Sequence, residues 1–180
     1  MSPPPAPLDG EPLMTRDLDA AAERVADLLL ELRATLAVSE SSAGGLISAA
    51  LLAVPGASRF FLGGAVVYTA VSREALLGIS AAEMAGIRSA SEPYAALLAR
   101  TMRARMGATW GLSETGAAGP TGNRYGDAAG HACLAVSGPA EMVRTLETGG
   151  SDRGANMEAF ALAALALLET QLVPGPEARA

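Results

Sequence analysis

The chain has 180 residues, half of them hydrophobic and 4% aromatic, with a formal net charge of -6 at pH 7 and a pI near 4.8. A chain of this length folds most simply as one domain with a real core, and its acidity argues against general nucleic-acid binding. No apolar run reaches the roughly 18 residues that a membrane span needs, so no membrane contact is expected.

The two ends of the chain differ in composition from its middle. Residues 1–14 are rich in proline and lack the basic start and apolar stretch of a signal peptide. We predict a disordered leader over 1–14, a single domain over 15–173 and a flexible tail over 174–180. The single Cys133 has no internal disulfide partner, which suits a cytoplasmic protein. The abundance of alanine and leucine also leads us to expect a homo-oligomer.

Helical and strand-like segments alternate along the chain. Periodicity and breaker residues predict helices over 15–34, 44–54, 72–78, 91–107 and 152–172. They predict strands over 35–39, 65–69, 109–115, 131–138 and 141–149, with 57–64 as a connector. The last two strands are expected to be antiparallel neighbours. The predicted fold is therefore a three-layer α/β/α sandwich with a mixed, mostly parallel sheet of about five strands.

The turn "ESSAGG" (Glu40 to Gly45) joins the first predicted strand to a helix. Ligands gather at the carboxyl ends of strands in open α/β sheets, and free backbone N–H groups there hold an oxyanion or phosphate. Ser41 or Ser42 is therefore a candidate nucleophile, and Gly44 and Gly45 permit close backbone approach. In the alternative interpretation Ser42 caps the helix and Ser41 satisfies local backbone groups.

Two further glycine-rich junctions carry polar side chains. The fifteen-residue loop from Gly116 to Gly130 contains Asn123, Arg124 and Tyr125, and loops of that size tend to be functional or disordered. In the segment "GGSDRG", Arg153 opens the last helix, where it suits a phosphate or carboxylate. The alternatives are a mobile surface loop, an N-cap at Asp152 and a solvated Arg153. Three such junctions fit one shared cleft.

Taken together, these junctions resemble the C-terminal domain of the CinA family, which includes nicotinamide mononucleotide (NMN) deamidases. The family pattern "ESCTGG" is matched by "ESSAGG", and "PGAS" is present at 55–58. The segment "GAVVYTAVSREALLG" corresponds to "GFVTYSNEAK…LG" and "ASE" at 90–92 to "VSE". "GAAGP" at 116–120 and "SDR" at 151–153 correspond to "GIAGP" and "GDR". The match covers about residues 18–172 in unbroken order.

The resemblance implies a reaction, hydrolysis of the NMN carboxamide to the acid and ammonia. It implies that Ser41 is the nucleophile, that Tyr68 lies in the site and that the family's lysine base corresponds to Arg73. The implied ligand-binding positions are Glu40, Ser42, Gly44, Gly45, Thr115, Gly116, Ala118, Gly119, Arg124 and Arg153, with Arg153 near the phosphate. The expected partner is a small nucleotide-like molecule. One histidine and one cysteine leave little to hold zinc, so no metal and no cofactor are expected.

The sequence departs from the family at the position of the base. All 13 basic residues are arginine, and a guanidinium cannot be deprotonated as a buried lysine can. Further departures are Ala70 for an asparagine, Ala43 for a threonine, Met157 for an arginine and Glu114 for an apolar residue.

Three interpretations follow from these departures. In the first, the amidohydrolase survives with a rebuilt base, for which Glu114, Tyr68 and His131 are the candidates in that order. In the second, the domain binds a nucleotide-like ligand or related amide without hydrolysing NMN, and Glu114 with Arg73 is a structural ion pair. A third, a purely structural interaction module, gives no reason for the three glycine-rich turns.

Overall fold

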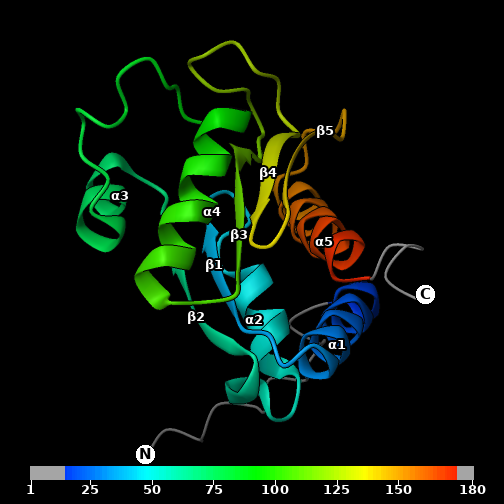
Figure 1. The fold of residues 1–180 in the computed structure, drawn as a ribbon. Helices are drawn as coiled ribbons and strands as arrows, with labels where there is room; N and C mark the ends of the chain where they lie inside the picture. The colour runs from blue at the N-terminus through cyan, green and yellow to red at the C-terminus, as the bar shows by residue number, and fades with distance from the viewer. Residues whose placement is uncertain (1–14, 174–180) are drawn as a thin grey trace, which may run out of the picture.

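The computed structural model describes residues 15–173, and its five strands form one sheet in the order β2-β1-β3-β4-β5 (Figure 1). The strands are β1 (Leu36–Glu40), β2 (Phe61–Val66), β3 (Trp110–Ala117), β4 (His131–Ser137) and β5 (Glu141–Glu147). Strand β1 is parallel to β2 and β3, whereas β4 is antiparallel to both β3 and β5. Because only β4 runs against the others, the predicted mixed, mostly parallel sheet of five strands is confirmed.

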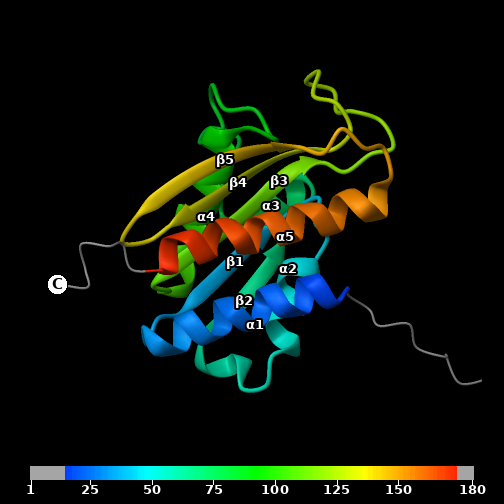
Figure 2. The ribbon, with the colours of Figure 1, turned by 90° about the vertical axis from the view of Figure 1, so that its right-hand side faces the viewer.

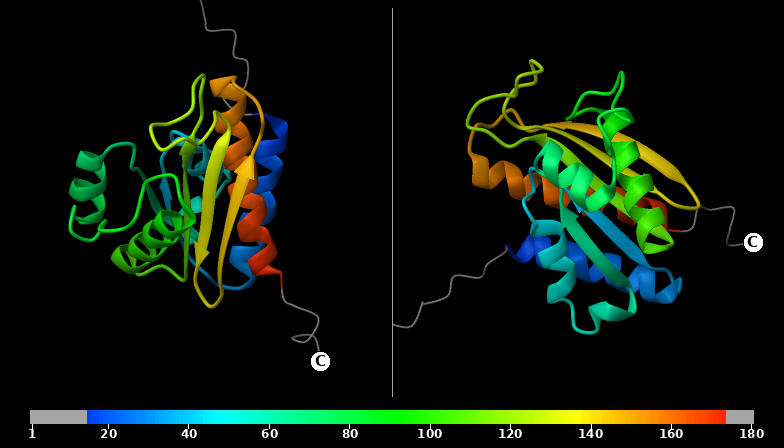
Figure 3. Two further views of the ribbon diagram at one scale, coloured as in Figure 1. Left: turned by 90° about the horizontal axis from the view of Figure 1, so that it is seen from above. Right: turned by 90° about the vertical axis from the view of Figure 1, so that its left-hand side faces the viewer.

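Helices cover both faces of this sheet and give the predicted three layers. The helices are α1 (Arg16–Glu31), α2 (Leu46–Ala53), α3 (Ala70–Leu77), α4 (Glu92–Met106) and α5 (Arg153–Leu172), with a 3-10 turn η1 at Ala57–Arg59. Helices α1 and α5 lie side by side along one face (Figure 2), with α2 packed against both. Helix α4 covers the opposite face, with α3 beyond it (Figure 3).

Most residues of the core are alanine, leucine, isoleucine or valine. Every residue of β1 and of β4 is buried, as expected for strands that are covered on both faces. Phe160 and Leu165 of α5 are fully buried in the main core cluster. The apolar last helix therefore lies buried against the sheet.

Helix ends follow the signals in the sequence. Helix α4 begins after Ser91, whose hydroxyl accepts from the Tyr94 N–H at 3.4 Å, and α3 ends at Gly78, which has a φ of 68°. Helix α1 begins where Thr15 predicts it, but the Thr15 hydroxyl donates to Glu158 and makes no cap bond.

The prediction for the second strand is wrong in its position. The strand occupies Phe61–Val66, so it begins four residues earlier than expected, within the predicted connector (57–64), and overlaps the predicted strand (65–69) only at residues 65 and 66. Gly63 and Gly64 favoured a connector, because glycine is uncommon inside strands. In the structure, a Cβ at Gly64 would collide with the Ser48 hydroxyl, so the close approach of α2 to this edge strand requires a glycine.

The predicted leader (1–14) and tail (174–180) lie outside the described residues. Across 15–173, none of the helices combines the length and the apolarity that a bilayer crossing requires.

Candidate active site

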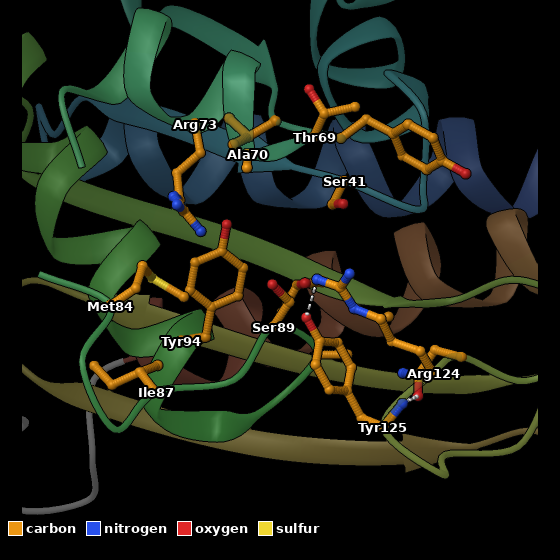
Figure 4. A pocket seen from close by; sticks show the side chains of 16 residues that line it. Ser41, Thr69, Ala70, Arg73, Met84, Ile87, Ser89, Tyr94, Arg124 and Tyr125 are labelled. Carbon is orange, nitrogen blue, oxygen red and sulfur yellow. Dashed lines mark hydrogen bonds between the residues drawn. The ribbon is translucent and has the colours of Figure 1, made fainter. Parts of the chain in front are cut away.

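A cavity of about 550 Å³ opens at the carboxyl ends of the parallel strands, between α3, the segment before α4 and the loop after β3 (Figure 4). Its lining includes six of the predicted site residues: Ser41, Tyr68, Arg73, Thr115, Gly116 and Arg124. The charged groups on this lining are the guanidiniums of Arg73 and Arg124, and no Asp or Glu of residues 15–173 belongs to it. The cavity is therefore electropositive in an acidic protein and suits an anionic ligand.

Ser41 stands directly after β1, with its side chain on the cavity wall (Figure 4). Its backbone N–H donates to the Glu114 carboxylate at 3.0 Å. Among residues 15–173 the Ser41 hydroxyl has no hydrogen-bond partner, so it is available to a ligand. The turn is thus fixed through its backbone, while its hydroxyl remains open to the cavity.

Glu114 binds the same turn from β3, the strand beside β1. Its carboxylate accepts from the N–H of Ala43 at 2.8 Å and from the Ser42 hydroxyl, as well as from Ser41 N. Full burial raises the pKa of Glu114, and the hydrogen bonds from Ser42, Ala43 and Ser41 oppose that rise. This carboxylate does not hydrogen-bond to the Ser41 hydroxyl and is absent from the cavity lining. These contacts indicate that Glu114 holds the turn in place. They do not support Glu114 as the base, the role for which it was the first candidate.

Glu40 occupies the N-terminus of α2. Its carboxylate accepts from the N–H groups of Gly45 at 2.9 Å, Ile47 at 3.1 Å and Ser48 at 3.0 Å, and from the Ser48 hydroxyl at 2.6 Å. The expectation that these N–H groups are free for a ligand anion is therefore wrong, because an internal carboxylate already holds them. The alternative of a Ser42 cap is wrong as well, since Ser42 donates to Glu114.

Gly44 and Gly45 allow the backbone conformation of the turn, but they do not line the cavity. Gly44 and Gly45 have φ values of 69° and 105°, a region that favours glycine. A Cβ at Gly44 would also lie 2.7 Å from the terminal methyl of Met157 on α5. Neither glycine lines the cavity, and nor do Glu40 and Ser42, so these four predicted ligand-binding residues support the turn instead.

The α3 side of the cavity carries Arg73 and the nearby Tyr94. Arg73 donates from Nε to the Ile79 carbonyl at 3.2 Å, and its terminal nitrogens point toward the Tyr94 hydroxyl (Figure 4). Burial raises the pKa of Tyr94, and Arg73 partly opposes this. The ion pair expected between Arg73 and Glu114 does not form, because Glu114 binds the Ser41 turn.

Tyr68 and Arg153 meet at the edge of the site. The Tyr68 side chain is exposed, and its hydroxyl accepts from a terminal nitrogen of Arg153 at 3.3 Å. The other terminal nitrogen of Arg153 donates to the Gly119 carbonyl at 2.7 Å. Arg153 does not line the cavity, whereas the loop arginine Arg124 does. Asp152 caps α5 by accepting from Ala155 N at 2.8 Å, as the alternative interpretation of this junction expected.

The loop of residues 116–130 is held by its own hydrogen bonds. Asn123 donates to the Asp127 carboxylate at 2.8 Å, and Arg88 from the segment before α4 binds the same carboxylate through both terminal nitrogens. Arg124 donates to the Tyr125 hydroxyl at 2.9 Å, and this bond is the first cause of the lowered pKa of Tyr125. The internal bonds favour an ordered wall of the cavity over the alternative of a mobile surface loop.

Ala118 and Gly119 of this loop face α5 and not the cavity. Asn156, a buried residue of α5, donates from Nδ2 to the Ala118 carbonyl at 2.8 Å and to the Gly150 carbonyl at 2.9 Å. The Gly119 carbonyl is taken by Arg153. Both predicted ligand-binding residues therefore anchor the loop to the helix.

His131, at the start of β4, does not line the cavity but supports its wall from behind. Its Nδ1 is 2.5 Å from a Glu147 carboxylate oxygen, and its Nε2 is 3.0 Å from the Ala90 carbonyl. Burial opposes the charged form, but these two acceptors and Asp127 outweigh it and raise the pKa of His131. With both ring nitrogens engaged, His131 does not serve as the base for Ser41.

Two features of the site went unnoticed in the sequence. Tyr94 and the segment ending at Ala90 form one wall of the cavity, although only "ASE" had been matched there. The sequence signal for this wall is a tyrosine two residues after the matched glutamate, in the first turn of a predicted helix. Asn156 carried a weaker signal, as a polar residue in the first turn of a largely apolar helix.

Comparison with known proteins places this geometry in a family. The family model described as "CinA C-terminal domain" matches residues 18–172. A CinA-like protein of Synechococcus sp. is 42% identical over 123 residues, which is 68% of this chain and 29% of that protein. A CinA-like protein of Myxococcus xanthus is 41% identical over 135 residues, covering 75% of this chain and 32% of that protein. The chain spans about a third of the length of these curated relatives.

Solved structures agree with these sequence relatives. The competence/damage inducible protein CihA of Agrobacterium tumefaciens superposes with a TM-score of 0.82 at 26% identity, over 90% of this chain and 99% of that one. A competence-damaged protein (CinA) superfamily protein of Enterobacter cloacae gives 0.80 at 27% identity, over 95% and 100%. The names of these proteins state no substrate.

Proposed function

Because the chain belongs to the CinA C-terminal domain family, we propose that it binds a mononucleotide-like carboxamide, NMN first, and hydrolyses it with Ser41 as nucleophile. The observation that carries the proposal is the Ser41 hydroxyl. It lies unbonded, on a rigid turn, in a cavity whose charged lining groups are guanidiniums. A nucleophile, a fixed backbone and a cationic wall suit acyl transfer on an anionic substrate.

The proposed reaction proceeds in two steps at Ser41. The hydroxyl oxygen adds to the carboxamide carbon, the serine proton passes to the departing nitrogen, and ammonia leaves an ester on Ser41. Water then hydrolyses the ester to the acid and restores the serine. Arg73, fixed by the Ile79 carbonyl, is a donor for the oxyanion that develops on the carbonyl oxygen.

A second candidate function is ligand binding without hydrolysis. One observation favours it: within residues 15–173, no acceptor binds the Ser41 hydroxyl, and a positioned base contributes about 10²- to 10⁴-fold to such reactions. Glu114 and His131 are engaged elsewhere, and Arg73 does not give up its proton. Without a base, the same cavity retains its ligand-binding groups but turns over slowly.

Ammonia release from NMN and a panel of related carboxamides tests the proposal. We expect turnover by the wild-type protein and its loss in Ser41→Ala. Ser89→Ala is the matched control, since it removes another hydroxyl from the same cavity. An equal loss in both variants contradicts the assignment of Ser41. No turnover together with NMN binding in calorimetry selects the binding function, and neither turnover nor binding refutes both.

A further inference from the structure

The cavity carries two positive charges that the protein itself does not neutralise. Arg73 donates to a backbone carbonyl and Arg124 to the Tyr125 hydroxyl, and both of these acceptors are uncharged groups. Neither guanidinium forms an ion pair within residues 15–173, whereas Arg88 binds a carboxylate close by. Unpaired guanidiniums on a cavity wall are binding groups for anions.

The two guanidiniums stand apart. Figure 4 shows the Arg73 and Arg124 guanidiniums apart from each other in the cavity, with Ser41 on the wall near Arg124. Arg73 comes from α3, and Arg124 comes from the loop after β3. A ligand that spans the cavity past Ser41 therefore meets a cation at each end.

Arg73 and the neighbouring Tyr94 offer hydrogen-bond donors at one end of the cavity. Its Nε is held by Ile79, so the terminal nitrogens remain for a ligand, and they point toward Tyr94. Tyr94 is buried, and the burial that raises its pKa keeps the phenol protonated at neutral pH. A planar fork of N–H groups beside an O–H group matches the acceptor-only oxygens of a carboxylate. A carboxamide fits less well, because its NH2 group would face the Arg73 N–H groups, and only the Tyr94 oxygen there can accept from it.

We propose that this cavity binds the carboxylate form of a pyridine mononucleotide in preference to the carboxamide form. The carboxylate lies at Arg73 and Tyr94, and the phosphate lies at Arg124. The inference rests on the proposed function, which supplies the ligand class. It adds that the acid form of the mononucleotide binds more tightly than the amide form. The acid that hydrolysis produces is therefore retained in the site after ammonia leaves. Its release then limits turnover.

Isothermal titration calorimetry with nicotinate mononucleotide and nicotinamide mononucleotide tests the inference. Both titrations use the Ser41→Ala protein, in which the amide is not consumed, and the wild type is titrated with the acid. We expect the acid to bind about tenfold more tightly than the amide, the ratio that separates a charge-assisted hydrogen bond from a neutral one. Equal affinities overturn the inference and leave the proposed function intact.

Three arginine variants in the same background assign the two ends of the ligand. Arg73→Gln removes the charge at the carboxylate end, so it is expected to abolish the preference for the acid while changing amide affinity little. Arg124→Gln is expected to weaken both ligands by a similar factor, because both carry the phosphate. Arg144→Gln, on the exposed strand β5, is the control outside the cavity and is expected to change neither.

The outcomes separate the two levels of the proposal. If Arg73→Gln weakens the binding of acid and amide equally, Arg73 does not distinguish the carboxylate from the carboxamide, and the inference is wrong. If the acid binds to wild type but the amide binds nowhere, the preference stands. If neither mononucleotide binds to a folded protein, the proposed ligand class fails and the inference fails with it. Thermal unfolding of each variant confirms that a lost affinity reflects the site and not the fold.

Discussion

Two buried carboxylates hold the Ser41 turn, and replacing one of them by glutamine distinguishes a clamp from a base. In Glu114→Gln, the amide oxygen can still accept from Ser41 N and Ala43 N. The amide nitrogen then faces the Ser42 hydroxyl, which reverses its role from donor to acceptor. Both backbone N–H groups keep an acceptor, and the Ser42 hydroxyl keeps one hydrogen bond. We therefore expect the free energy of unfolding to change by less than about 1 kcal/mol.

The same substitution at Glu40 has a different outcome. Each Glu40 oxygen faces a backbone N–H, from Ser48 on one side and from Gly45 and Ile47 on the other. Whichever way the amide turns, its NH2 group meets a backbone donor. An unsatisfied buried donor costs about 1–3 kcal/mol, so Glu40→Gln is expected to be destabilising by at least that amount.

Trp110, the single tryptophan, is buried at the start of β3 and reports unfolding by fluorescence in urea. The difference in midpoint between Glu114→Gln and Glu40→Gln is the measured quantity. We expect Glu40→Gln to be the less stable variant, because only there does the new NH2 group face a backbone N–H. Equal destabilisation of the two variants would show that the hydrogen-bond pattern around Ser41 is not the one described.

The pH dependence of Glu114→Gln adds a second check. The pKa of Glu114 is raised in the folded protein, so between 4.5, its ordinary value, and the raised value the folded state binds the extra proton. Stability contributed by this group therefore falls as pH rises through that window, and the variant gains on the wild type with increasing pH. For activity, a clamp predicts retained turnover. A loss of about 10²-fold or more in a stable variant restores Glu114 as the base.

Two further predictions concern the supports of the cavity walls. The pKa of His131 is raised, so its contribution to stability is complete below about 6.5 and is lost as pH rises through the higher folded value. The stability difference between wild type and His131→Gln in urea should shrink over that range, and a difference independent of pH contradicts the contact with Glu147. Asn156→Ala leaves the Ala118 and Gly150 carbonyls without their donor and is expected to cost about 2–4 kcal/mol. A change in unfolding free energy below about 1 kcal/mol, measured by calorimetry, rules out that role.

The sequence predicts best those elements whose ends are encoded locally. The Ser91 cap and the Gly78 stop place α4 and α3 within a few residues, because one side chain or one φ angle decides each boundary. The strand β2 was misplaced because its glycines are explained by a distant contact. Only the packing of Ser48 from α2 against Gly64 shows why an edge strand lacks side chains there.

The site likewise contains residues that the sequence predicts and residues whose role depends on distant contacts. Ser41, Tyr68 and Arg73 follow the family motif along the chain, and all three line the cavity. The role of Glu114 was not predictable, because it depends on which strand lies beside β1. Strand β3 pairs with β1 so that Ser113 lies opposite Ser39, and the following residue, Glu114, then reaches the next turn of its neighbour. A glutamate that the sequence suggested as a base is thereby committed to backbone N–H groups.

Arg73 links the proposed reaction to the proposed retention of the acid, and Arg73→Lys tests both at once. A lysine at this position keeps a positive charge and is able to lose a proton, whereas it lacks the planar fork that pairs with a carboxylate. The substitution is therefore expected to raise ammonia release from NMN, by up to about 10²-fold, the lower end of a general-base contribution. It is also expected to weaken binding of nicotinate mononucleotide. The two effects have opposite signs in one protein, so a general loss of folding or of cavity shape cannot imitate them. A gain in turnover with unchanged acid affinity contradicts the retention proposal alone. Loss of acid affinity without any gain in turnover means that Ser41 lacks more than its base.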